Sequence, residues 1–117
     1  GHSPLFVCGA SIGANLALKA VAELEVEKAI LLSAGINYRW IEAIPLAKSL
    51  PENKQVFIVA TEDDVRTLGT AAEQGQKIFD AFTCKKEIRI FEKGGHGTNI
   101  FKAHPELMKE LIKWLKD

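Results

Sequence analysis

The arrangement of this chain follows from residues 5–18, Leu5-Phe6-Val7-Cys8-Gly9-Ala10-Ser11-Ile12-Gly13-Ala14-Asn15-Leu16-Ala17-Leu18. A short apolar run is followed by Gly-x-Ser-x-Gly and then by apolar residues at helical spacing, which predicts a strand, a sharp turn and a helix. Gly9 and Gly13 flank Ser11, and we expect a Cβ at either glycine to clash because the strand and helix backbones approach closely. The turn therefore exposes the Ser11 hydroxyl at the edge of a sheet.

The helix after Ser11 would point its free N–H groups and its positive dipole end at this serine. Such a position favours an alkoxide or oxyanion, and the N–H of Ile12 is the natural first oxyanion donor. Together these features predict a nucleophile elbow. A plain glycine-rich turn is the alternative, whereas a dinucleotide-binding turn is disfavoured because Ser11 replaces the middle glycine of Gly-x-Gly-x-x-Gly.

The length and composition indicate one globular domain over residues 1–117, in which Gly1-His2-Ser3 has the form of a tag remnant. Hydrophobic residues make up 47% and charged residues 26% of the chain, as is ordinary for a globular protein. The 15 basic and 15 acidic residues are scattered and cancel, so nothing indicates a nucleic-acid partner or a membrane surface.

The sequence contains no apolar run of the roughly 20 residues that span a membrane, and no signal-peptide pattern, so we expect a cytoplasmic protein. Cys8 and Cys84 form neither a CxxC motif nor a disulfide framework and are expected to be free thiols. The histidines and acidic residues lack the spacing of metal ligands. We therefore expect no metal and no cofactor.

The rest of the chain predicts an α/β fold, a four-stranded parallel sheet with helices on both faces. Apolar patterns place strands at 5–8, 29–33, 55–60 and 87–91, and helices at 11–24, 41–50, 70–82 and from Pro105 onward. The strand at 87–91 alternates charged and apolar residues like an exposed edge, whereas the others are continuously apolar. Residues 33–40 are expected to form a pocket wall, unless their aromatic residues only shield the core.

Two of the predicted helices carry apolar residues at helical spacing. In the first helix these residues are Ile12, Leu16, Ala17, Ala20, Val21 and Leu24, and in the last helix the side chains expected to face inward are Leu107, Met108, Leu111, Ile112, Trp114 and Leu115. The start of the helix at 70–82 is marked by a capping box, Thr70-Ala71-Ala72-Glu73.

In a parallel sheet all strand-to-helix loops emerge at one edge, so Ser11, the loop at 61–64 and the loop around His96 should converge. A serine nucleophile needs a base, and the base needs a group that orients it. His96 would accept the Ser11 proton through one ring nitrogen while an acid holds the other. Turn or cap roles for the acids, and a satisfied loop histidine, are the alternatives.

These residues resemble the C-terminal half of an α/β-hydrolase of the serine esterase or dienelactone-hydrolase type. The resemblance covers essentially the whole chain and rests on Gly9-Ala10-Ser11-Ile12-Gly13 as elbow, Glu62-Asp63-Asp64 as acid loop and Gly94-Gly95-His96-Gly97 as histidine loop. In relatives of this kind the acid stands three residues after the small residue closing the strand, here Thr61, which implies Asp64 rather than Asp63. His104 is expected instead to cap the last helix.

The resemblance implies hydrolysis of a small carboxylic ester through an acyl-Ser11 intermediate. The loop that supplies the second oxyanion donor would precede the elbow, and no HGGG-type segment is present in this sequence. One missing donor costs about 100- to 1,000-fold in rate, so we expect weak activity. The alternative is a half-domain with little or no turnover that serves as a folding or assembly module.

The first strand also predicts a homodimer. Leu5-Phe6-Val7-Cys8 is apolar on both faces, as is typical of an interior strand, but no outer neighbour is predicted for it. Antiparallel pairing with the same strand of a second copy would give a two-fold interface and join the two sheets into one of eight strands. The active edges of the copies would then point in opposite directions.

Overall fold

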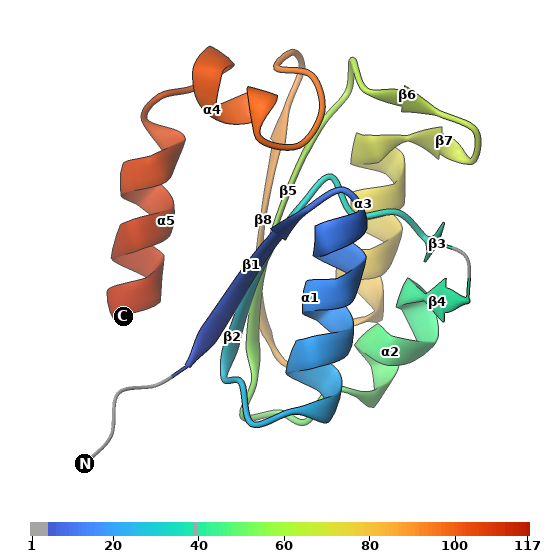
Figure 1. The fold of residues 1–117 in the computed structure, drawn as a ribbon, viewed down its shortest axis with the longest axis vertical. Helices are drawn as coiled ribbons and strands as arrows, with labels where there is room; N and C mark the ends of the chain where they lie inside the picture. The colour runs from blue at the N-terminus through green and yellow to red at the C-terminus, as the bar shows by residue number, and fades with distance from the viewer. Residues whose placement is uncertain (1–4, 39) are drawn as a thin grey trace.

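The computed structural model describes residues 5–38 and 40–117, so the expected tag remnant, Gly1–Ser3, lies outside the described residues. Within them a parallel sheet has the strand order β1-β2-β5-β8 (Figure 1). Its strands are β1 (Phe6–Ala10), β2 (Lys28–Leu32), β5 (Gln55–Thr61) and β8 (Lys85–Phe91). The prediction of a four-stranded parallel sheet is confirmed.

Helices cover both faces of this sheet, as predicted (Figure 1). One face is covered by α1 (Ile12–Glu23), α2 (Ala43–Ser49) and α3 (Ala71–Ala81), and the other by α4 (Asn99–Ala103) and α5 (Leu107–Lys116). Each face of the sheet forms its own apolar cluster with the helices that cover it, because the side chains of a strand point alternately to the two faces. Leu31 and Ile58 belong to the first cluster, and Leu32 and Val59 to the second.

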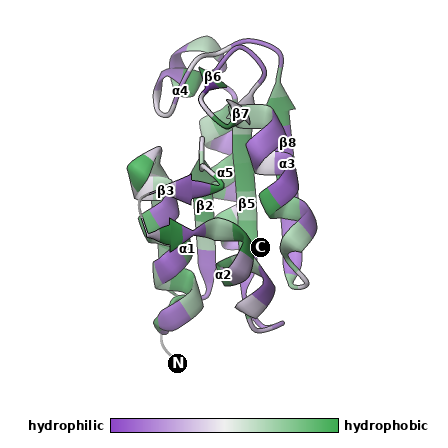
Figure 2. Ribbon diagram, turned by 90° about the vertical axis from the view of Figure 1, so that its right-hand side faces the viewer, coloured by the Kyte–Doolittle hydropathy of each residue, from purple (hydrophilic) through white to green (hydrophobic). Residues whose placement is uncertain are grey.

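Burial along the strands follows the sequence pattern. Every residue of β2 is buried, and β5 is buried from Val56 to Thr61, which fits their continuous apolar runs (Figure 2). The residues of β8 alternate between exposed and half-buried over most of its length, as its alternating sequence predicts for an edge strand. The capping box before α3 is present, with Thr70 and Glu73 bonded to each other's backbone N–H groups.

Two hairpins and one short helix were not predicted. β3 (Asn37–Tyr38) pairs with β4 (Ile41–Glu42), and β6 (Val65–Arg66) pairs with β7 (Gly69–Thr70), in both cases antiparallel. Two-residue strands, like the five-residue helix α4, are too short to show a periodic pattern. The helix expected at 41–50 accordingly begins two residues late, because residues 41–42 belong to β4.

The buried faces of the first and last helices differ from the expectation. α1 buries Ala14, Ala17, Leu18 and Val21, whereas Ile12, Leu16 and Leu24 are exposed. Small residues face the sheet because the helix lies so close to it. In α5, Leu107 and Leu111 are buried but Met108 and Ile112 are exposed.

His104 does not cap the last helix, so that expectation is wrong. The residue is the C-cap of α4, and the N-cap of α5 is Glu106. The His104 ring stacks on Phe91 with 3.7 Å between centroids, and its Nε2 lies 2.6 Å from the carbonyl oxygen of Lys93. It therefore fastens the end of β8 to the segment after α4.

Both cysteines are free thiols, as predicted. The structure also contains, over residues 5–38 and 40–117, no helix with the length and apolar character needed to cross a membrane.

The crossing of β1 and α1 depends on Gly9. A Cβ on Gly9 would lie 2.0 Å from the carbonyl oxygen and 2.3 Å from the carbonyl carbon of Gly13, closer than any contact permits. A Cβ on Gly13 would have no neighbour within 4 Å. The predicted clash is therefore correct for Gly9 and wrong for Gly13. Gly9 lies against the main chain of Gly13, whereas the position of a Gly13 side chain is open.

This asymmetry gives a matched pair of variants. Gly9→Ala should lower the free energy of unfolding by about 3 kcal/mol or prevent folding, because backbone atoms must move to admit the methyl group. Gly13→Ala should leave stability unchanged or raise it by up to about 1 kcal/mol, since alanine favours the helix. Urea unfolding followed by circular dichroism measures both, and equal stabilities of the two variants would contradict this account.

Candidate active site

Ser11 occupies the turn between β1 and α1 with a strained backbone, φ 58° and ψ −117°. A side chain rarely adopts a positive φ, and such a residue persists only when its surroundings hold it. The Ser11 N–H donates to the Leu32 carbonyl at 2.8 Å, and the Ser11 carbonyl accepts from the Ala14 N–H at 3.0 Å. This geometry is that of the predicted elbow, in which the serine projects from the sheet edge.

The N-terminus of α1 begins directly after this serine. Ile12 and Gly13 are the first residues of the helix, so no carbonyl one turn earlier can accept from their N–H groups. No side chain caps this end of the helix either. The Ile12 N–H, predicted as an oxyanion donor, therefore stands beside Ser11 at the positive end of the helix dipole.

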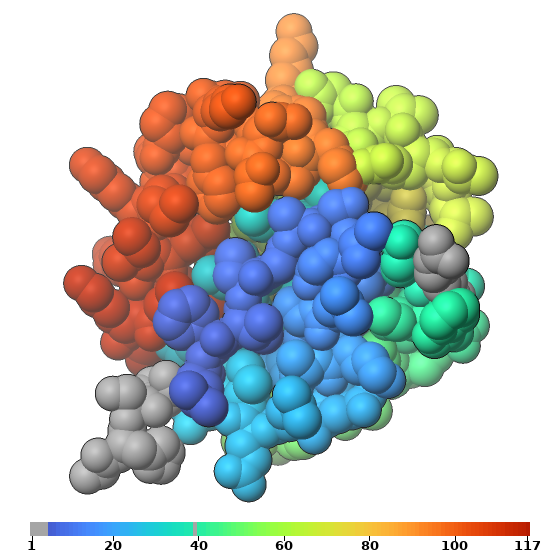
Figure 3. All heavy atoms as spheres, in the orientation of Figure 1, coloured from blue at the N-terminus to red at the C-terminus, as the bar shows by residue number. Residues whose placement is uncertain are grey.

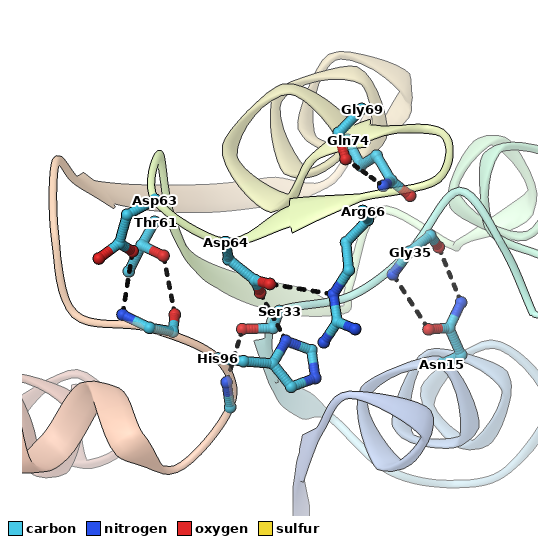
Figure 4. A network of polar contacts seen from close by, with 12 residues as sticks. Asn15, Ser33, Gly35, Thr61, Asp63, Asp64, Arg66, Gly69, Gln74 and His96 are labelled. Atoms are coloured by element: carbon cyan, nitrogen blue, oxygen red, sulfur yellow. Dashed lines mark hydrogen bonds and ion pairs between the residues drawn. The ribbon is translucent and has the colours of Figure 1, made fainter.

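His96 and Asp64 are in direct contact, with 2.5 Å between His96 Nδ1 and Asp64 Oδ2 (Figure 4). The Asp64 side chain is only 6% exposed, and its other oxygen, Oδ1, forms an ion pair with Arg66 Nε at 3.0 Å. An ionised carboxylate only accepts hydrogen bonds, so the proton of a neutral His96 ring lies on Nδ1. The second ring nitrogen, Nε2, is then able to accept a proton.

Asp63, the competing acid, has a different set of partners. Its carboxylate accepts from the Gly94 and Gly95 N–H groups at 3.1 and 3.0 Å. The nearby Thr61 hydroxyl and these two amides lower the pKa of the Asp63 carboxyl. Asp63 thus holds the histidine loop through its backbone, whereas Asp64 holds the imidazole itself.

Two hydroxyl groups also tie the histidine loop to the ends of neighbouring strands. Thr61 Oγ1 donates to the Gly95 carbonyl at 2.7 Å, and Ser33 Oγ accepts from the Gly97 N–H at 2.9 Å (Figure 4). Ser33 has a positive φ of 57°, like Ser11. Sequence reasoning missed Ser33 as a positioning residue, since nothing in the pattern distinguishes it from other serines at strand ends.

Ser11 and His96 line one cavity of about 310 Å³. Its walls include the loop after β2, which buried amide side chains hold in place. Asn15 forms two hydrogen bonds with the Gly35 backbone, of 2.8 and 3.1 Å (Figure 4). Gln74 accepts from the Ile36 N–H at 2.9 Å and donates to the Gly69 carbonyl at 3.0 Å. These contacts fix the shape of the pocket.

The expected pocket wall at 33–40 contributes through residues up to Tyr38, which lines the cavity. Trp40 does not line the cavity and is 85% exposed, so it does not shield the core either. Arg39 lies outside the described residues. The wall is thus shorter than the predicted segment.

The hydrogen bonds of the described residues include none between Ser11 and His96, although both side chains face the same cavity. In free enzymes catalytic hydrogen bonds are often long and tighten when substrate binds. The described part of the chain also has no group of three or more His, Cys, Asp or Glu residues arranged to hold a metal ion.

The fold is similar to solved structures of α/β-hydrolases. An acetyl xylan esterase from Paenibacillus sp. R4 superposes with a TM-score of 0.77 and 14% identity over 97% of this chain and 45% of that protein. Pyrococcus horikoshii acylaminoacyl peptidase gives a TM-score of 0.73 and 15% identity over 97% of this chain and 24% of that protein. An α/β-hydrolase from a Medee basin deep-sea metagenome gives 0.66 and 20% identity over 94% and 52%.

No family model and no curated protein matches the sequence. The structural likeness confirms the predicted resemblance at the level of the fold: the chain has the fold of part of an α/β-hydrolase. It spans between 24% and 52% of the lengths of the proteins compared above.

Proposed function

We propose that this chain is a serine hydrolase that cleaves small carboxylic esters through an acyl-Ser11 intermediate. The observation that carries the proposal is the contact between His96 Nδ1 and Asp64 beside a cavity lined by both Ser11 and His96. Ser11 is the nucleophile, His96 the general base and Asp64 the residue that orients the imidazole. Hydrolase neighbours in the structural comparison support the same class of chemistry.

The reaction proceeds in two halves. Ser11 Oγ bonds to the ester carbonyl carbon while its proton passes to His96 Nε2, and the oxyanion that forms accepts from the Ile12 N–H. Collapse of this intermediate breaks the ester bond, and the departing alcohol takes the proton from His96. Water then repeats the sequence on the acyl-serine, which releases the acid and restores the Ser11 hydroxyl.

The proposal includes slow turnover. Ile12 supplies one oxyanion donor, and residues 5–38 and 40–117 include no HGGG-type segment that could supply a second. Removal of one such donor costs about 100- to 1,000-fold in rate. The partner of the site in this proposal is a small ester.

A second proposal concerns assembly and is favoured by the free edge of β1. Within the described part of the chain this strand is hydrogen-bonded only to β2, and its first residue, Phe6, and the preceding Leu5 are 55% and 62% exposed. Figure 3 shows β1 on the surface between α5 and α1. On α5 the exposed Ile112 lines a cavity together with Leu5 and Phe6, and α1 also carries an exposed apolar side chain, Leu16. We propose that β1 pairs with β1 of a second copy to form a homodimer.

The backbone directions of β1 identify which groups face the free edge. The Leu5 carbonyl accepts from the Glu27 N–H just before β2, and the Ser11 N–H donates to the Leu32 carbonyl at the end of β2. Both groups therefore point toward β2. Because successive residues of a strand alternate in direction, Phe6 and Cys8 point their N–H groups away from β2. These are the donors that a second copy would use.

The first test is covalent labelling with a fluorophosphonate. Ser11 should react because it lines the same cavity as the proposed base, His96, and directly precedes the N-terminus of α1, whereas Ser33 and Ser49 should not. An activated ester such as 4-nitrophenyl acetate should give a burst of 4-nitrophenol that Ser11→Ala abolishes. A folded protein that gives neither adduct nor burst would favour the inactive assembly module instead.

The two acids provide a matched comparison. Asp64→Asn should reduce the esterase rate by up to about 10,000-fold, as loss of the orienting acid stabilises the wrong imidazole tautomer. Asp63→Asn keeps one acceptor for the Gly94 and Gly95 amides and should cost less than about tenfold. Steady-state kinetics with both variants checks the order, and equal losses would show that Asp64 has no special role.

Dimer formation is tested by light scattering. The protein should be a dimer at micromolar concentration, and Cys8→Pro, which removes an edge donor, or Phe6→Lys, which places a charge there, should give folded monomers. Glu87→Lys on the opposite edge strand is the control and should remain dimeric. A folded wild-type monomer under these conditions would disprove the proposal.

A further inference from the structure

One cation stands at the wall of the candidate active site. Arg66 belongs to β6, its side chain is 43% exposed, and it lines the same cavity as Ser11 and His96. Figure 4 shows its guanidinium between His96 and the Asn15–Gly35 pair. The location was not predicted, because β6 is too short for a sequence signal.

The described residues that line the cavity carry a net positive charge. None of the described residues that line it is acidic, and Arg66 is the only one with a permanent charge. The partner carboxylate, Asp64, is almost fully buried and does not line the cavity. A ligand inside would therefore meet a positive charge.

Arg66 also retains most of its hydrogen-bonding capacity. A guanidinium has five N–H donors, and the ion pair with Asp64 engages only its Nε. The two terminal nitrogens form the planar fork that matches a carboxylate. The bond to Asp64 holds this fork in place, so little conformational freedom is lost when a ligand binds.

We propose that Arg66 binds a carboxylate of the substrate, so that the site selects esters that carry a negative charge close to the scissile bond. This inference rests on the proposed ester hydrolysis and adds the substrate class. Arg66 thereby has two contacts, one to Asp64 and one to the substrate, and the experiment must separate them.

Pairs of esters that have similar shapes but differ in charge separate the effect of the substrate contact from that of the Asp64 contact. The first pair is 3-acetoxybenzoate and 3-acetoxybenzamide, and the second is the mono-4-nitrophenyl ester of adipic acid and its half-amide, so that the charge lies on the alcohol or on the acyl side. In at least one pair kcat/KM should favour the anion by about tenfold, the value of one charge-assisted hydrogen bond at a partly exposed site. Added NaCl should weaken the preference.

Arg66→Gln should abolish the preference, and Arg66→Lys should keep part of it. A role through Asp64 alone would reduce both esters of a pair equally and leave their ratio unchanged. Arg89→Gln, at an exposed ion pair with Glu110, is the control and should retain the wild-type ratio. Wild-type ratios near one in both pairs, or a preference that survives Arg66→Gln, would overturn the inference.

A binding measurement keeps this inference distinct from the proposed hydrolysis. In Ser11→Ala, titration with adipate should shift the Arg66 side-chain N–H resonances in NMR spectra, and adipamide should not. Ester turnover without adipate binding at Arg66 would reject the anion site alone. Adipate binding without turnover of any ester would reject the hydrolase proposal and leave the anion site standing.

Discussion

The close approach of Gly9 to the Gly13 carbonyl fixes the geometry of this sheet edge. Because no side chain separates them, β1 and α1 cross backbone against backbone, and the turn between them must place Ser11 at φ 58°. A residue held in this region costs on the order of 1–3 kcal/mol. Small residues of α1, Ala14 and Ala17, pack against the sheet and maintain the approach. The serine and the helix N-terminus are thus brought together by one backbone contact.

The position of His96 depends on backbone contacts more than on side-chain packing. Gly94, Gly95 and Gly97 all have positive φ values, of 148°, 78° and 60°, which let the loop turn its amides toward the neighbouring strand ends. Asp63 and Ser33 accept from these amides. The backbone on both sides of His96 is therefore held in place. The contact between Asp64 and the imidazole then has to fix only the orientation of the side chain.

The sequence predicts those parts whose signals are local or periodic. Glycine spacing locates the turn at Ser11, and continuous apolar runs identify β2 and β5 as interior strands. The buried amides of Asn15 and Gln74 have no such signal, because their partners are backbone groups of loops distant in the chain. The face of α1 was assigned incorrectly for a related reason: periodicity favours large aliphatic residues, whereas a helix this close to a sheet buries alanines.

The charge of Arg66 bears on the chemistry as well as on recognition. In the proposed reaction His96 becomes an imidazolium, and the Arg66 guanidinium, which is ion-paired with the same carboxylate, opposes that second positive charge. Among the described residues, Asp64 is the acid in contact with both side chains. A substrate carboxylate bound to Arg66 would neutralise the guanidinium while the imidazolium forms, so its contribution would grow from ground state to transition state. On this reasoning an anionic substrate raises kcat as well as lowering KM, and a neutral ester leaves the two cations in competition for one acid.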